Sequence, residues 1–293
     1  MTVLVFFLIQ QVNWKEVWGY LKNMRPFFLF LSVCFYLVGI IISARKWQVL
    51  SIFKNFQKSY YFYFKTYLLG TFLNNFFPSF IGGDAYRIHS LGKFDKRFKD
   101  SSLTVVIDRI SGLLGIVVLA AFFGILNYKN IINNQTVFWL VIAMMIVSIA
   151  FFMGALFFNS RIAQILINYF PNKIKIFIKQ LGEFRRKKIF FKTINYSFLF
   201  VFVGVTLANY ILFLALNIKL SFFDFLSVTF LANIIASIPI SVGNIGVKEL
   251  AYILLFGIFG VDTSAAVTVV VVARVLQILI SLIAIPFYIQ NKK

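Results

Sequence analysis

Long uninterrupted apolar runs are the feature that most constrains this chain. A helix that crosses a bilayer needs about 20 mostly apolar residues. Four runs reach that length, and a fifth is interrupted only by Arg274 and Gln277; the five runs are residues 26–44, 102–126, 137–158, 196–216 and 264–289. Residues 2–9 form a shorter apolar segment, expected to be an incomplete first span. The sequence therefore predicts an all-α integral membrane protein with about six transmembrane helices in a single domain, residues 1–293.

The composition agrees with this prediction and excludes a water-soluble enzyme. Hydrophobic residues make up 61% of the 293 residues and charged residues 13%, whereas soluble domains are nearer half apolar and a quarter charged. Cys34 is the single cysteine, which excludes an internal disulfide bond and a cysteine-rich metal site.

Two further apolar stretches end in helix-breaking residues. Residues 60–77 are followed by Pro78 and the pair Gly82-Gly83, and residues 222–238 are followed by Pro239, Gly243 and Gly246. Proline removes a backbone donor and glycine frees the backbone, so both helices should break there. Broken backbone at membrane depth is tolerated where it is buried or lines a wet cavity. We therefore predict two re-entrant helical hairpins; two ordinary short spans joined by a loop are the alternative.

Basic residues are concentrated on one predicted side of the membrane. Most of the 29 Lys and Arg residues fall in loops 45–65 and 84–101, in segment 159–192 and in the C-terminal tail. By the positive-inside rule these regions are cytoplasmic, which predicts a multi-pass protein of a prokaryotic plasma membrane with a cytoplasmic C-terminus. Segment 159–192 is basic and amphipathic, so it is either a helix pair on the anionic leaflet or a loop that only fixes topology. The formal charge of +20 is thus explained without nucleic acid.

The two hairpins open from opposite sides of the predicted membrane. This opposition suggests an inverted repeat of residues 1–126 and 137–289, in which each hairpin is followed by a span that carries an intramembrane arginine, Arg109 or Arg274. Pro78 then aligns with Pro239, Gly82 with Gly243, and Arg87 with Lys248.

Polar residues are concentrated at the predicted break after the first apolar hairpin helix. The candidate substrate-binding residues here are Asn75, Ser79, Gly82, Gly83, Asp84 and Arg87. The glycine pair exposes N–H groups near a helix start, and an arginine can grip a phosphate with two hydrogen bonds. Asp84 has a second interpretation as a helix N-cap.

Ionisable residues inside apolar runs are costly and usually face a partner or a water-filled path. Asp108 and Arg109 lie in the run 102–126, and the second hairpin and last span add Ser241, Gly243, Asn244, Gly246, Lys248, Glu249 and Arg274. Together the basic residues predict a cationic midplane cavity that binds a phosphate- or carboxylate-bearing substrate. The alternative is a structural ion pair of Asp108 and Arg109 with each other or with Glu249.

The remaining motifs point away from known catalytic centres. His89 is the only histidine and is expected to be an ordinary polar loop residue. The sequence has no P-loop and completes no Ser-His-Asp set, HExxH motif or Cys/His cluster, so no catalytic residue, metal site or cofactor is predicted.

Three groups of residues closely resemble the lysylphosphatidylglycerol synthase transmembrane family, also called flippase-like domain proteins. They are Asn75-x2-Pro78-x3-Gly82-Gly83-Asp84-x2-Arg87, Asp108-Arg109-x2-Gly112-Leu113, and Pro239-x-Ser241-x-Gly243-x2-Gly246-x-Lys248-Glu249, together with Arg45-Lys46-Trp47. The resemblance covers essentially the whole chain, although Asn244 stands where the family often has glycine. It implies a transporter of an anionic or aminoacylated phospholipid or lipid-linked precursor, without the soluble aminoacyl-transferase domain of larger relatives.

Membrane lipids are therefore the expected partners. Two other functions fit the same residues. One is a membrane-embedded headgroup transferase with Asp84 or Asp108 as its base, and the other is a membrane subunit that presents lipid to a separate synthetase or glycosyltransferase.

Overall fold

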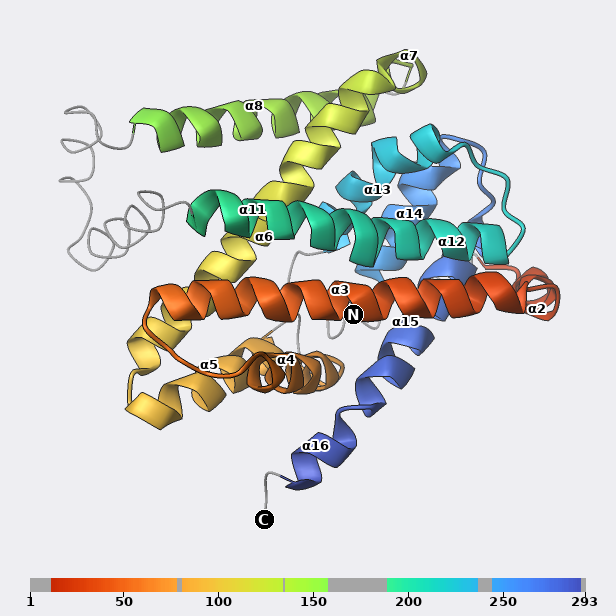
Figure 1. Cartoon of the computed structure of the whole chain (residues 1–293). Coiled ribbons are helices and arrows are strands. Elements are labelled where there is room, and N and C mark those ends of the chain that lie inside the picture. Colours follow the sequence, from red (N-terminus) through yellow and green to blue (C-terminus); the bar gives the residue numbers. More distant parts are fainter. Residues whose placement is uncertain (1–11, 78–80, 134, 158–188, 237–243, 291–293) are drawn as a thin grey trace.

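A computed structural model describes residues 12–77, 81–133, 135–157, 189–236 and 244–290. Every described element is helical, which confirms the predicted all-α membrane fold (Figure 1). The short segment 2–9, most of the basic segment 159–192, and the residues Pro78, Ser79, Pro239, Ser241 and Gly243 lie outside the described residues.

Four described helices are long and apolar enough to cross a membrane. They are α3 (Pro26–Phe53), α6 (Phe98–Leu126), the continuous helix Phe191–Ala215, and the segment Thr263–Phe287. The third of these consists of α11 (Ile189–Leu199), the π-helical segment η1 (Phe200–Leu207) and α12 (Ala208–Ala215). The predicted span at 137–158 forms α8 (Gln135–Phe157).

The spans predicted to start at residues 102 and 196 begin earlier, at Phe98 and Ile189, and two other spans differ from the prediction at their C-terminal ends. The helix predicted to end at residue 44 continues to Phe53, because Lys46 and Trp47 are buried by neighbouring helices instead of lying in a basic loop. The predicted helix 264–289 breaks into α15 (Thr263–Leu282) and α16 (Ile285–Gln290). Pro286 has no N–H to donate to the Leu282 carbonyl, so the regular hydrogen-bond pattern ends there.

Each predicted hairpin forms a pair of helices packed against one another. The first pair is α4 (Tyr60–Asn74) with α5 (Ile81–Asp95), and the second is α13 (Phe222–Ala236) with α14 (Val247–Gly257). Gly70 and Gly83 let α4 and α5 approach closely, and the Gly83 N–H donates to Asn74 Oδ1 at 2.7 Å. That either pair is re-entrant stays a prediction.

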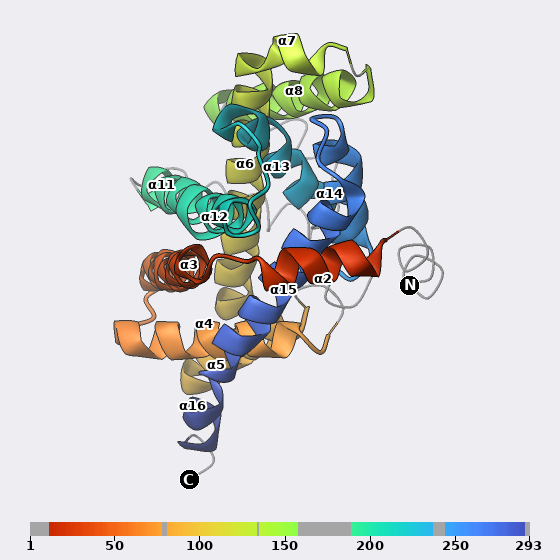
Figure 2. The same ribbon diagram turned by 90° about the vertical axis from the view of Figure 1, so that its right-hand side faces the viewer.

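The helix α3 and the continuous helix α11–η1–α12 lie side by side along one face of the fold (Figures 1 and 2). They are antiparallel, because contacts that advance along α3 move backward along its neighbour. Ser32 donates to the Ala208 carbonyl, Gly39 meets Gly204, and Lys46 donates to Ser197. Neither glycine has room for a side chain, so the two backbones pack directly, as small residues allow in membranes.

Each helix pair contacts one of these two helices, the first pair through α4 on α3 and the second through α13 on η1. Helix α13 of the second pair contacts α6, and α4 of the first pair contacts α15. Helix α2 (Trp14–Lys22) begins at the N-cap Asn13 and packs on α15 through Val17 and Val267. Trp14 and Trp18 of this helix are exposed.

Candidate functional site

Five charged side chains from α3, α5 and α6 form what we call the first ion cluster: Lys46, Asp84, Arg87, Asp108 and Arg109. At its buried end the Asp108 carboxylate lies 2.9 Å from Lys46 Nζ and 2.8 Å from Arg87 Nη2. The guanidinium of Arg87 also lies over the rings of Trp47 and Tyr67, at 4.5 and 4.7 Å from their centroids. This end is closed to solvent and held from three helices.

The other end of the first ion cluster is more open. Arg109 donates from Nε and Nη2 to the two carboxylate oxygens of Asp84, at 2.8 and 2.7 Å. The side chains of Arg109 and Asp84 are 33% and 21% exposed, against 2–4% for the three residues at the buried end. Arg87 Nη1 also contacts Asp84 at 3.3 Å and so joins the two ends.

A second ion cluster, consisting of Lys248, Glu249 and Arg274, lies between α14 and α15. Arg274 Nη2 is 2.8 Å from Glu249 Oε1, while Glu249 Oε2 accepts from the Gly246 N–H at 2.8 Å and completes the start of α14. Gly246 has φ of +89° and Asn244 a φ of +59°, a conformation that turns the backbone into the helix. Lys248 Nζ lies 5.5 Å from the centroid of the Tyr252 ring.

The ion pairs Asp84–Arg109 and Glu249–Arg274 correspond in position. Asp84 and Arg109 are separated by 25 residues, and Glu249 and Arg274 are also separated by 25 residues. The residues of the second pair follow their counterparts by the same interval that separates Gly39 from Gly204. This agreement favours the inverted repeat, which stays a prediction. With this interval, each residue of hairpin one aligns with a residue four positions further along hairpin two than in the alignment of Pro78 with Pro239. Four residues are about one helical turn.

Several predicted site residues come together in these clusters, and others do not. Asn75 donates to Ser281 Oγ at 2.9 Å and thereby links α4 to α15. Gly82 packs against Phe77, and the Gly83 N–H is taken by Asn74, so the glycine pair serves helix packing.

The alternative roles considered for Asp84, as an N-cap, and for Asp108, as an ion-pair partner of Arg109, are both wrong. Asp84 is not an N-cap, because α5 begins at Ile81 and the Asp84 carboxylate faces Arg109. Among the described residues, Asp108 and Arg109 form ion pairs neither with each other nor with Glu249. Two neighbours on one helix turn cannot face each other, so Asp108 and Arg109 bind partners on different helices.

Sequence reasoning missed Lys46, which it assigned to a basic loop. The side chain is buried, and its ammonium also lies 3.0 Å from the Asp108 carbonyl oxygen. The signal in the sequence was Arg45-Lys46-Trp47, one of the groups of residues that resemble the family. His89 is exposed, and no group of metal-ligating residues occurs in the described part of the chain.

Comparisons with known proteins show which chains are similar. The family model described as "Lysylphosphatidylglycerol synthase TM region" matches residues 1–285. A UPF0104 membrane protein of Pyrococcus horikoshii is 27% identical over 85% of this chain and 82% of its own length. One of Methanothermobacter thermautotrophicus is 22% identical over 89% and 84%, and one of Methanocaldococcus jannaschii is 27% identical over 75% and 95%. No solved structure matches the chain.

Proposed function

This chain belongs to the lysylphosphatidylglycerol synthase transmembrane family, and on that premise we propose that it moves an anionic or aminoacylated phospholipid, or a lipid-linked precursor, between membrane leaflets. The substrate headgroup would bind the cations of the two ion clusters. The membrane would be the plasma membrane of a prokaryote, with the C-terminus in the cytoplasm.

The observation that carries this proposal is the pair of arginines at corresponding positions, each partly exposed and each on the span that follows a helix pair. Arg109 and Arg274 are 33% and 23% exposed, and each pairs with a carboxylate. Among the described residues, each cluster contains one more cation than carboxylate: Lys46, Arg87 and Arg109 with Asp84 and Asp108, and Lys248 and Arg274 with Glu249. Such an excess favours an anion.

The geometry of the Asp84–Arg109 pair suits exchange for a phosphate. Arg109 already presents two donors in the bidentate arrangement that phosphate oxygens accept as well as carboxylate oxygens do. A headgroup phosphate that replaced Asp84 would keep the guanidinium neutralised, so the cost of desolvating the arginine would not rise during exchange. The buried Asp108 end would keep the three helices together meanwhile.

A liposome assay tests the proposal. The purified protein is reconstituted with fluorescent phosphatidylglycerol or fluorescent phosphatidylcholine, and the fraction of label protected from an external quencher is followed over time. We expect faster equilibration of phosphatidylglycerol. Arg109→Ala and Arg274→Ala should each slow it by about tenfold or more, the effect of losing about 1.4 kcal/mol of transition-state stabilisation.

Arg97→Ala is the matched control. Arg97 is 35% exposed and is also paired with a carboxylate, Asp100 at 2.6 Å, but it lies at the start of α6 outside both clusters. The double variant Asp84→Asn/Arg109→Gln removes a whole pair without leaving a lone charge. If Arg109→Ala and Arg274→Ala transport phosphatidylglycerol at the rate of Arg97→Ala, the clusters do not bind the substrate. A product with a changed headgroup mass would instead favour a transferase.

A further inference from the structure

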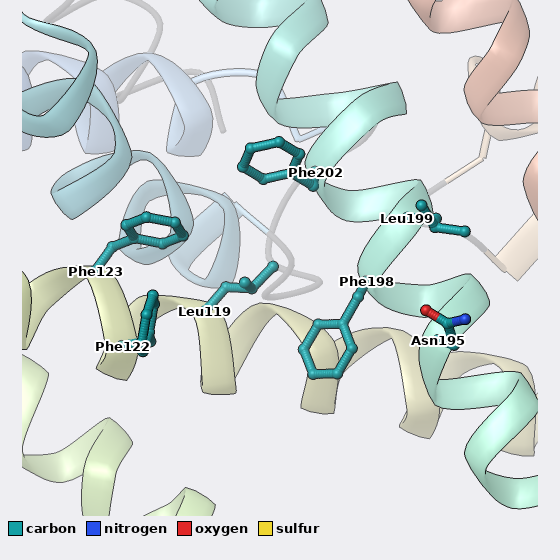
Figure 3. Close-up of a pocket in the computed structure, with 7 residues that line it drawn as sticks. All are labelled: Leu119, Phe122, Phe123, Asn195, Phe198, Leu199 and Phe202. Atoms are coloured by element: carbon teal, nitrogen blue, oxygen red, sulfur yellow. The ribbon is translucent and has the colours of Figure 1, made fainter.

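A groove lies on the outer side of the fold between α6 and the continuous helix α11–η1–α12 (Figure 3). It encloses about 270 Å³, and six of its seven lining residues are apolar. The lining comes from Leu119, Phe122 and Phe123 on α6, from Asn195, Phe198 and Leu199 on α11, and from Phe202 in η1. Phe122 and Leu199 are exposed at its rim.

The groove continues a stripe of α6 that starts in the first ion cluster. Asp108, Gly112, Gly115, Leu119 and Phe122 are spaced by four and three residues, which places them on one helix face. Along the stripe, the neighbours of these residues change from charged to polar to apolar. A Cβ on Gly112 would lie 3.7 Å from Lys46 Nζ, a Cβ on Gly115 would lie 3.4 Å from Ser197 Cβ, and the last two residues line the groove.

The facing helix shows the same change from polar to apolar. Ser197 accepts a hydrogen bond from Lys46 Nζ at 3.3 Å, while its neighbour Phe198 lines the groove. Gly115 packs against Ser197, and the helices α6 and α11 cross each other (Figure 1). The groove lies between them. It is therefore one end of a seam whose other end holds the buried cations.

We propose that this groove binds an acyl chain of the transported lipid while its anionic headgroup lies at Arg109, at the open end of the first ion cluster. The inference rests on the proposed function, since it places the same substrate. A phospholipid has the charge and apolar tail that the two ends of the seam complement. Both α6 and the facing helix are membrane spans by length and composition, so acyl chains are what surrounds the groove. Aromatic rings give such a chain broad apolar contact at low entropic cost.

Photolabelling of the unmodified protein tests the site directly. The probe is phosphatidylglycerol with a diazirine in its acyl chain, at low content in phosphatidylcholine vesicles, and labelled peptides are mapped by mass spectrometry. We expect labelling of residues 119–123 and 195–202 at about five times the level of the lipid-facing α8 residues Ile146 and Ile149, a preference of about 1 kcal/mol. A phosphatidylcholine probe with the same diazirine chain should label the groove no more than α8.

A groove-filling variant links the site to transport. Leu119→Trp should slow phosphatidylglycerol transport and reduce labelling of residues 195–202, whereas Ile146→Trp on the outer face of α8 should change neither. Equal labelling of groove and α8, or equal labelling by both probes, would show only surrounding bilayer lipid and overturn the inference. If that result accompanies transport that still depends on Arg109, the proposed function stands and only the acyl site fails. Absence of transport in the unmodified protein would instead refute the proposed function.

Discussion

At the scale of single residues, Asp108 is the group on which the first ion cluster depends. Its carboxylate lies against both Lys46 and Arg87, and all three side chains are almost fully buried. Asp108→Asn leaves two buried cations without that carboxylate, and breaking a buried pair in this way costs about 3–5 kcal/mol. We expect a large loss of stability in detergent, measured as a lower midpoint of thermal unfolding and a lower yield of folded protein.

The matched control for this prediction is Asp100→Asn on the same helix. Asp100 also pairs with an arginine, but its side chain is 29% exposed, so the loss should stay within about 1 kcal/mol. Equal unfolding midpoints for the two variants would mean that the Asp108 cluster does not hold the helices together.

Residue types predicted some of the residues of this site, but they could not predict which charged side chains pair with each other. Asp108, Arg109 and Arg274 stood out because ionisable groups in apolar runs are costly. Their partners could not be inferred, because pairing depends on how helices distant in sequence are packed. Lys46 was missed because it follows Arg45 at the end of an apolar run, and a basic residue at such a position is ordinarily solvated.

At the scale of helices, the contact between α3 and η1 depends on two glycines. A Cβ on Gly39 would lie 2.7 Å from the Cα of Gly204, a distance that real contacts do not reach. The neighbour is backbone and cannot turn aside. We expect Gly39→Ala and Gly204→Ala each to destabilise the protein by about 1–3 kcal/mol, measured by thermal unfolding in detergent.

Gly257→Ala is the corresponding control in α14, where nothing lies within 4 Å of the added methyl group. There the substitution should be neutral or stabilising by up to about 1 kcal/mol, because alanine favours a helix over glycine. If Gly39→Ala unfolds at the same midpoint as Gly257→Ala, the two backbones are not in direct contact.

Helix existence was predictable from apolar length, whereas helix ends were set by packing or by one residue. The extension of α3 to Phe53 follows from burial of Trp47, which a hydropathy pattern does not contain. The break before α16 has a local cause in Pro286 and was readable from the sequence, but the apolar run around it concealed the signal. The π-helical turns of η1 have no sequence signature of this kind.

At the scale of the whole molecule, the two ends of helix α3 lie at opposite ends of the fold. At one end the Arg25 N–H donates to the Ala215 carbonyl at 2.8 Å, which brings the α2–α3 and α12–α13 connections together. Residues 54–59 lie at the other end, 28 helical residues away, about 42 Å along the axis. The charge distribution predicts that the first end is outside the cell and the second is cytoplasmic.

Single cysteines test this orientation in a Cys34→Ser background. Lys219→Cys should react with a membrane-impermeant maleimide on intact cells, whereas Gln57→Cys should react only after the membrane is permeabilised; both positions are exposed. The reverse pattern would show that the chain is inserted the other way. Labelling of both positions on intact cells would show that they do not lie on opposite sides.

The burial of Lys46 has a consequence for how the protein is made. Its carboxylate partner is 62 residues further along the chain, and its hydroxyl partner Ser197 is 151 residues further. When α3 leaves the ribosome, neither partner has been synthesised, and a lone ammonium is poorly tolerated in hydrocarbon. We therefore expect the end of α3, which the charge distribution predicts to be cytoplasmic, to reach its final packing only after α6 has been inserted.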